Sequence, residues 1–187
     1  ERVRDRAERL APERVLVRGL FSGGTLCYES LVILADVLGP VYSNTPIDKS
    51  LGLPAPAGAH TCLDLGEEEY TKGRPHPMID PEARIELLRE QGADGEVAVI
   101  ILDVVLGYGA HSDPAAELAP VCADITANGG PAIVVYVLGT EQDPQDLAAQ
   151  RRAFTEAGCV VTETAARASL AAAALATRAP ELAASAL

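Results

Sequence analysis

The sequence has no apolar run long enough to cross a membrane. Its most apolar stretch, Val97 to Leu106, is about half the length that a membrane helix needs and carries Asp103. No signal peptide is visible. We therefore expect neither a membrane span nor a membrane partner. The only methionine is Met78 and the chain begins at Glu1, so we expect a fragment or trimmed chain with a segment missing in front.

Basic residues are too few for a nucleic-acid-binding surface. Lys and Arg number 15 against 27 Asp and Glu, which gives a net charge of −12. Phosphate backbones are bound by clustered Lys and Arg. The arginines that gather near the N-terminus alternate with acids, which is typical of a solvated helix face. They are Arg2, Arg4, Arg6, Arg9, Arg14 and Arg18. Nucleic acid is thus not an expected partner.

Closely spaced cysteine pairs of the kind used for zinc or redox chemistry are also absent. The four cysteines are far apart, and each lies in an apolar pattern: Cys27, Cys62, Cys122 and Cys159. Buried free thiols in a reducing compartment explain this distribution best. We predict a cytoplasmic protein without a metal site.

What the sequence does contain is an alternation of short apolar runs and helical patterns. About five βα units of this kind predict an α/β fold, a flavodoxin-like three-layer arrangement around a parallel sheet. The expected strands are Val15 to Leu20, Cys62 to Leu65, Val97 to Leu106, Ala132 to Leu138 and Cys159 to Thr162, with Val41 to Ser43 as a further short candidate. The continuous run at Val97 to Leu106 belongs at the sheet centre.

Helix starts and stops carry clear signals. Asp80, Asp113 and Asp143 are each followed by a proline, the pattern of an N-cap with proline in the first turn, and Gly92 is an expected stop. The expected helices are residues 1–11, 26–38, 81–91, 114–127, 145–157 and 164–176, and the residues from Pro180 are expected to fray. Residues 1–14 form a charged helix or linker, and residues 15–187 form the domain.

One long polar loop, Leu63 to Pro81, is too rich in proline and glycine for a helix or strand. Its prolines restrict the backbone around Arg74 and His76. The loop is either a functional element or a rigid connector. In a parallel sheet it lies at the carboxyl edge with three other polar loops, Ser22 to Thr25, Tyr108 to His111 and Thr140 to Asp143. That convergence predicts a ligand site.

Two features of these loops concern charge. Ser22-Gly23-Gly24-Thr25 precedes a helix, so its N–H groups suit a phosphate or carboxylate, although it is equally an ordinary turn with Thr25 as N-cap. Asp103, near the end of a buried strand, must be paired, hydrogen-bonded or close to the water-filled rim.

Four motifs in order resemble the FdrA family over roughly residues 15–175. They are Gly19 to Cys27, Asp64 to Gly66 with Gly73 to Pro81, Leu102 to His111, and Gly139-Thr140 with Asp143 to Gln145. FdrA proteins resemble the α subunit of succinyl-CoA synthetase and other NDP-forming acyl-CoA synthetases. The resemblance implies that this chain is the flavodoxin-like CoA-ligase domain, without the N-terminal CoA-binding Rossmann domain. It also implies CoA and a nucleotide as cofactors of the full-length protein, none of them certain in this chain.

The resemblance implies a phosphate-activated acyl or carbamoyl group, with phosphate, acyl phosphate or carbamoyl phosphate as the small anionic substrate. In the synthetases a histidine after the strand equivalent to Ala132 to Leu138 carries phosphate, whereas residues 139–145 here have none. As an alternative, the resemblance implies that this chain belongs to a subunit of an oxamate carbamoyltransferase, as some FdrA-like proteins do. Such an enzyme makes carbamoyl phosphate in allantoin breakdown. A third alternative is a non-catalytic anion-binding or subunit-contact module.

The candidate residues follow from the loops and the chemistry. His76 and His111 are the candidate catalytic groups, although either one equally suits a plain hydrogen-bonding role. The candidate substrate- or phosphate-binding residues are Ser22, Gly23, Gly24, Thr25, Arg74, Gly107, Tyr108 and Gly109. Arg74 is the favoured anion ligand, because a guanidinium binds phosphate in a bidentate manner. We also expect a partner domain or subunit, an oligomer, and little activity from this fragment alone.

Overall fold

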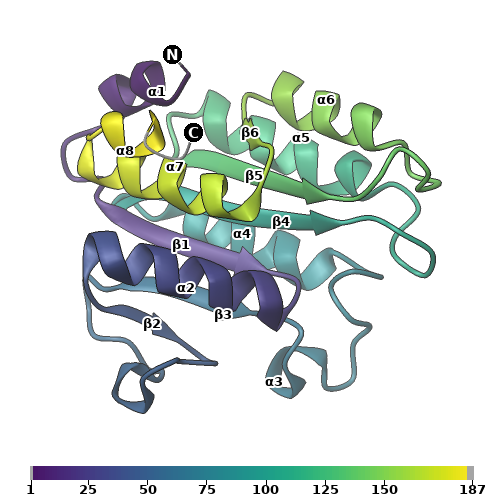
Figure 1. Ribbon diagram of the computed structural model, residues 1–187, viewed down its shortest axis with the longest axis horizontal. Helices are drawn as coiled ribbons and strands as arrows, with labels where there is room; N and C mark the ends of the chain where they lie inside the picture. Colours follow the sequence, from purple (N-terminus) through teal and green to yellow (C-terminus); the bar gives the residue numbers. More distant parts are fainter. Residues whose placement is uncertain (1, 185–187) are drawn as a thin grey trace.

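Six parallel strands form the sheet that the alternating pattern predicts. The computed structural model describes residues 2–184. The strands are β1 (Leu16–Phe21), β2 (Val41–Ser43), β3 (His60–Asp64), β4 (Val97–Val105), β5 (Ala132–Leu138) and β6 (Val160–Thr162). Their order across the sheet is β2-β3-β1-β4-β5-β6 (Figure 1). The fold class is the α/β class that the sequence predicts.

The expected number of about five strands is one too low. The sixth is β2, a three-residue edge strand that pairs only with β3. Without β2, the remaining five strands follow the flavodoxin-like order, in which the second strand lies outside the first. Three residues are too few for a sequence pattern to distinguish a strand from a connector, so β2 was expected only as a further short candidate.

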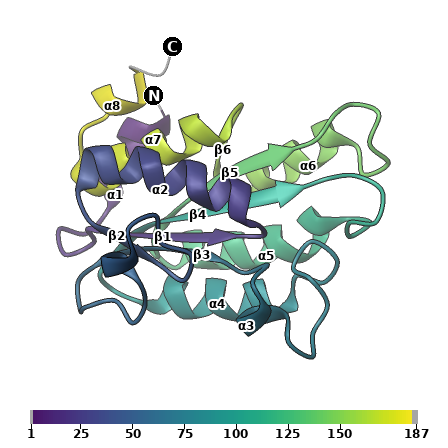
Figure 2. The same cartoon turned by 60° about the horizontal axis from the view of Figure 1, so that its bottom comes forward.

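Helices cover both faces of the sheet. On one face lie α1 (Arg2–Arg9), α2 (Gly24–Leu38) and α7 (Ala165–Thr177), and on the other lie α4 (Glu82–Ala93), α5 (Pro114–Ala127) and α6 (Leu147–Glu156) (Figures 1 and 2). Short helices occur at α3 (Glu68–Thr71) and α8 (Glu181–Ala184), with a 3-10 turn at Lys49–Leu51. The result is the predicted three-layer arrangement.

The strand β4 lies between β1 and β5, as its continuous apolar run predicts. Its residues from Val97 to Leu102 are at most 1% exposed. Val99 and Ile101 face the core under α2 and α7, whereas Ile100 and Leu102 face the core under α4 and α5. A strand buried on both faces needs apolar side chains at successive positions, which explains the missing alternation.

Several helix boundaries differ from those expected. Helix α4 does not stop before Gly92 but ends at Ala93. A Cβ at Gly92 would lie 2.6 Å from Ile125 Cδ1, so this glycine permits close packing of α4 against α5. Helix α6 begins after Asp146, not after Asp143, and Asp146 accepts from Ala149 N. Helix α2 already begins at Gly24, and the loop expected to lack helix contains α3. By contrast, Asp113 caps α5 as predicted.

The N-terminal segment is held to the domain by arginine side chains. Ala7 of α1 is 6% exposed and belongs to the core under α7. Arg14 Nη1 donates to the carbonyls of Asp94 and Val97, both at 2.8 Å. Arg178 reaches back from the end of α7 to the Ala11 carbonyl at 2.7 Å. Helix α1 ends at Arg9, two residues before the expected end.

Two simpler expectations concern the cysteines and the chain ends. All four cysteines are buried and free, as predicted. No helix in the part of the chain that the structure describes is long and apolar enough to cross a membrane. Residues 181–184 form α8, and the rest of the tail that we expected to fray, residues 185–187, lies outside the described residues.

Replacing Ile101 with Ala should destabilise the domain by roughly 2–5 kcal/mol, because the side chain is 1% exposed in the central strand and its removal leaves a cavity. Denaturant titration measures this loss. Val32→Ala, at a position that is 57% exposed on α2, is the control and should change stability by less than about 0.5 kcal/mol. A negligible loss at Ile101 would contradict its burial.

Candidate functional site

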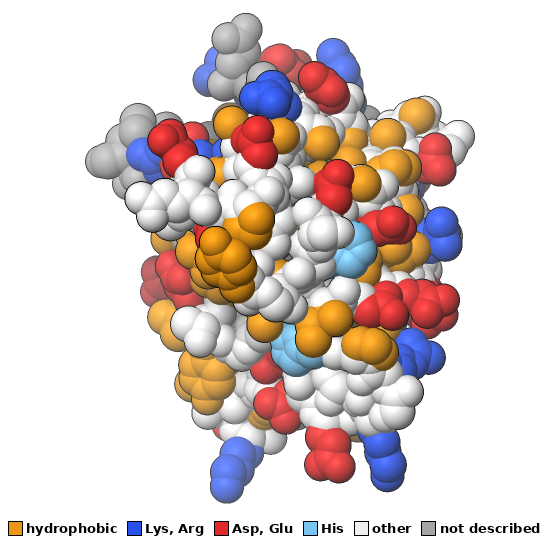
Figure 3. Space-filling model, turned by 90° about the vertical axis from the view of Figure 1, so that its right-hand side faces the viewer, with side chains coloured by type: hydrophobic (Ala, Val, Ile, Leu, Met, Phe, Trp, Pro, Cys, Tyr) orange, Lys and Arg blue, Asp and Glu red, His pale blue; other side chains and the backbone are white. Residues whose placement is uncertain are grey.

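The carboxyl edge of the sheet brings the four polar loops into contact. The end of β3, the turn after β1 and the long loop all approach Gly66. A Cβ there would lie 2.8 Å from His76 Nε2 and 3.1 Å from both Asp64 Oδ1 and the Ser22 carbonyl. His111 N donates to the Met78 carbonyl at 2.7 Å, which joins two of the loops. Figure 3 looks onto this edge and shows two histidine side chains among uncharged groups, with carboxylates around them.

A buried carboxylate, Asp103 near the end of β4, fixes the turn between β1 and α2. Ser22 donates to it twice, from its backbone N to Oδ1 at 2.7 Å and from its hydroxyl to Oδ2 at 2.5 Å. Both residues are 1% exposed. The hydroxyl of Ser22, a predicted ligand-binding group, is therefore already committed to Asp103. The expectation that Asp103 must be paired or hydrogen-bonded is confirmed.

Arg84 of α4 supplies the opposite charge. Its Nη2 donates to the Asp103 carbonyl and lies 3.4 Å from Asp103 Oδ1. Burial lowers the pKa of Arg84, and the Asp103 carboxylate opposes this shift. A guanidinium stays protonated in proteins, so the two side chains form an ion pair. Its Nε is buried without a hydrogen-bond partner. The ion pair thus connects α4 to the end of β4, next to the turn that precedes α2.

The N-terminus of α2 has no side-chain cap. Gly23 is the N-cap residue in an extended conformation, and Gly24 is the first helical residue. Thr25, considered as an alternative N-cap, lies within the helix and is exposed. The first N–H groups of a helix have no carbonyl acceptor within the helix, and the helix dipole adds positive potential there. This glycine turn can therefore bind an anion through its backbone.

Asp64, at the end of β3, lies beside this helix N-terminus. Its Oδ1 accepts from Gly66 N at 2.8 Å, and Asn44 binds both its backbone N and its carbonyl at 2.9 Å. A Cβ on Gly24 would lie 2.9 Å from Asp64 Oδ2, so the carboxylate reaches the first turn of α2. Burial, followed by the Asp64 charge, raises the pKa of the nearby Cys27 thiol to about 12.

His76 enters the same cluster from the long loop. Its Nδ1 accepts from Met78 N at 3.2 Å, which assigns the proton of the neutral ring to Nε2. That nitrogen is the one near Gly66 and Asp64. A larger residue at position 66 would displace the ring. The geometry thus places an imidazole N–H on one side of Gly66 and the Ser22 carbonyl on another, with the half-buried ring held by its own loop.

The second half of the edge is the turn after β4, which contains His111. Gln145, 6% exposed, holds this turn through bonds from its Nε2 to the Gly107 and His111 carbonyls at 2.8 and 3.1 Å. His111 Nδ1 accepts from Asp113 N at 3.1 Å. Gly107 and Gly109 adopt positive φ of 137° and 87°, and Tyr108 between them is 93% exposed.

Arg74, the favoured anion ligand, does not join the cluster around Gly66 in this structure. Its Nη1 lies 3.2 Å from Glu86 Oε2 of α4, in an exposed ion pair. The hollow around it, about 320 Å³, is otherwise lined by the acids Asp80, Glu82 and Glu86 and by uncharged residues. Such an acidic surrounding gives a free anion little attraction.

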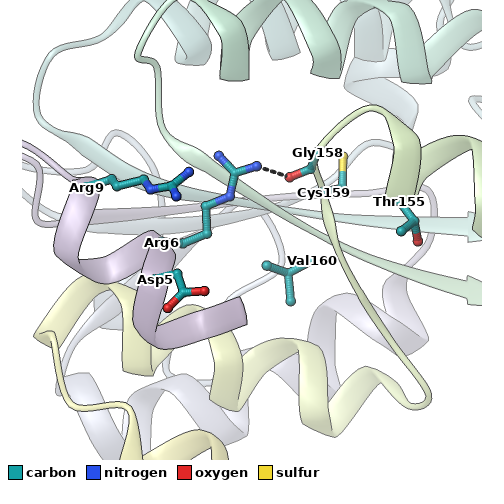
Figure 4. A pocket seen from close by; sticks show the side chains of 7 residues that line it. All are labelled: Asp5, Arg6, Arg9, Thr155, Gly158, Cys159 and Val160. Atoms are coloured by element: carbon teal, nitrogen blue, oxygen red, sulfur yellow. Dashed lines mark hydrogen bonds between the residues drawn. The ribbon is translucent and has the colours of Figure 1, made fainter. Parts of the chain in front are cut away.

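A different hollow, of about 290 Å³, lies at the opposite edge of the sheet, before β6 begins (Figure 4). Arg6 of α1 points into it and donates to the Gly158 carbonyl at 2.5 Å, with Arg9 beside it. A Cβ on Gly158 would lie 2.9 Å from Arg6 Nη2. This contact holds α1 in place and is remote from the four loops.

Sequence reasoning overlooked three residues of the site: Asp64, Arg84 and Gln145. Asp64 stands in a motif that we singled out, but only the fold reveals that it reaches α2. Arg84 lies in a helix rich in charged residues, where an arginine is ordinarily solvated. Among the described residues, no group of three or more His, Cys, Asp or Glu side chains is arranged to hold a metal ion.

Replacing Arg84 with Met should destabilise the protein by about 3–5 kcal/mol, because the Asp103 charge then stays buried without its counter-ion. Urea titration at neutral pH measures the loss. Arg89→Met, at an exposed position of the same helix, is the matched control and should cost less than about 0.5 kcal/mol. Equal effects of the two substitutions would show that the pair has no special role.

The comparisons with known proteins agree with this architecture. A family model described as CoA-ligase matches residues 20–175. The uncharacterized protein YahF of Escherichia coli strain K12 is 39% identical over 169 residues, which cover 87% of this chain and 33% of YahF. The chain thus spans about a third of the length of this curated relative. The family match begins at the end of β1 and contains β2 to β6 and all four polar loops. The chain belongs to the CoA-ligase family.

Proposed function

We propose that the carboxyl edge binds the anionic part of a phosphate-activated acyl or carbamoyl group. The domain would serve a ligase or transferase reaction of the acyl-CoA synthetase superfamily. Phosphate, acyl phosphate and carbamoyl phosphate are the candidate ligands. The observation that carries the proposal is the N-terminus of α2, where Gly23 and Gly24 leave the helix without a side-chain cap. The bonds from Ser22 to Asp103 fix the position of this turn.

The residues of the edge have separate roles in this proposal. The N–H groups of residues 23–25 would hold the phosphate oxygens, which are stabilised by the helix dipole. The Nε2 proton of His76, on the far side of Gly66, would donate to an oxygen of the ligand or of its leaving group. His111, with Gly107, Tyr108 and Gly109, would form the second wall of the site.

Ser22 and Arg74 have more limited roles. The Ser22 hydroxyl donates to Asp103 and is not free to attack a substrate, so Ser22 positions the turn. Arg74 would have to leave Glu86 before it could contact an anion. An exposed ion pair of this kind contributes only about 0–1 kcal/mol, so a bound phosphate could displace it.

Carbamoyl transfer is the second candidate reaction, and the loop after β5 favours it. Residues 139–145 contain no histidine, and Thr140 N donates to Asp143 Oδ2 at 2.6 Å, which closes the loop on itself. A phosphohistidine relay in this loop is therefore not available, whereas carbamoyl transfer does not require one. Turnover of oxamate with carbamoyl phosphate, compared with turnover of succinate with CoA and ATP, would distinguish the two reactions.

Assignment to FdrA proteins within the CoA-ligase family is also our proposal. CoA and a nucleotide, which the family implies, would be bound with the help of a partner domain or subunit in an oligomer. A cytoplasmic location fits the four free thiols. A non-catalytic anion-binding or subunit-contact module would use the same edge without turnover.

Phosphate added to the protein should shift the backbone amide resonances of Gly23, Gly24 and Thr25 more than those elsewhere. If Arg74 closes over the anion, Arg74→Ala should weaken binding about tenfold, the loss of one charge-assisted hydrogen bond. Amide NMR titration measures both effects.

The control for this titration is Arg152→Ala, which removes an exposed arginine on α6. Shifts spread over the whole surface, or none at all, would refute the anion site. Equal weakening by both substitutions would remove Arg74 from it.

A further inference from the structure

Only one of the two carboxylate oxygens of Asp64 accepts a hydrogen bond from the described part of the protein. Oδ1 accepts from Gly66 N at 2.8 Å, and within residues 2–184 no hydrogen bond reaches Oδ2. The residue is only 4% exposed. Its Oδ2 is directed at Gly24, where a Cβ would be 2.9 Å away. An acceptor oxygen without a protein donor, on a nearly buried residue, thus lies beside the helix N-terminus.

The position of this carboxylate is fixed by its neighbours. Asn44 fixes the Asp64 backbone through bonds to its N and its carbonyl. Gly66 N holds Oδ1, so the side chain cannot turn away without losing that bond. Gly24 has no side chain that would block its approach. The charged or titratable groups around it include His76 across Gly66, Cys27 on α2, and Asp103 behind Ser22.

An anion at the α2 turn would therefore meet two opposite influences. The N–H groups of the turn attract its oxygens, whereas the Asp64 carboxylate repels any oxygen without a proton. An oxygen that carries a proton removes the conflict, because it can donate to Oδ2. Buried acceptors left without a donor are the basis on which sites reject ligands that lack one.

We propose that Asp64 restricts the α2 turn to oxyanions that carry their own hydrogen-bond donor, such as the P–OH of hydrogen phosphate, and excludes aprotic oxyanions such as sulfate. This inference rests on the proposed anion site and adds its selectivity. Phosphate and sulfate are both tetrahedral and similar in size, so the donor is the feature that distinguishes them. Asp64 is then a residue that determines specificity by direct contact with the ligand.

The test is titration of inorganic phosphate and of sulfate, separately, into the whole chain at neutral pH and constant ionic strength. The wild type should bind phosphate at least about tenfold more tightly than sulfate. In Asp64→Asn the new amide keeps a carbonyl for Gly66 N and turns an N–H donor to the ligand. The preference should fall to about equal affinity, mainly because sulfate binds more tightly.

Two further variants make the result specific. Asp36→Asn removes the same charge from an exposed position near the other end of α2, and it should keep the phosphate preference. Gly24→Ala places a Cβ 2.9 Å from Oδ2, so the carboxylate must shift and the preference should fall without a change at Asp64. This second route remains available if Asp64→Asn does not fold.

The outcomes separate the two proposals. Equal binding of phosphate and sulfate by the wild type would overturn the role of Asp64 but would still support the anion site. Absence of binding of either ion would overturn the anion site itself. A preference that survives in both Asp64→Asn and Gly24→Ala would also overturn the inference, because the discrimination would then arise elsewhere.

Discussion

The buried ion pair between Asp103 and Arg84 is the interaction on which the carboxyl edge depends. Asp103 is anchored in the central strand β4, and its carboxylate holds the backbone and hydroxyl of Ser22. Arg84 compensates its charge from α4. A buried carboxylate is stable only when it is paired and hydrogen-bonded. One side chain thus fixes the start of α2 relative to β4 and α4, the elements that build the site.

Small residues then decide how closely the loops approach each other. Gly24 admits the Asp64 carboxylate to the first turn of α2, and Gly66 admits the His76 ring. In both places a Cβ would lie within 3.0 Å of a polar atom. Neither glycine needs a positive φ, so the requirement is one of space rather than backbone conformation. Close contact between backbone and polar side chains thus shapes this edge of the sheet.

The sequence predicts the fold well because the fold follows from local patterns. The apolar run of β4 and the Asp113-Pro114 start of α5 are examples, because each element can be predicted from its own residues. Gly92 was misjudged because its partner, Ile125, lies on another helix, and Asp146 was missed because Asp143 shows the same capping chemistry. The convergence of the loops follows from strand direction. The pairing of Asp64 with the α2 turn depends on strand order, which no local pattern contains.

Charge gives the final constraint on what the edge can bind. The chain carries a net charge of −12, and the guanidinium of Arg84 is already paired with Asp103. In our proposal the first attraction for an anion then comes from backbone dipoles at α2, which act over a short range and require a close fit. A site built in this way selects its ligand by hydrogen-bond pattern rather than by net charge. In our proposal the Asp64 oxygen at the same turn would sharpen that selection, because it adds an acceptor beside the N–H donors of the turn.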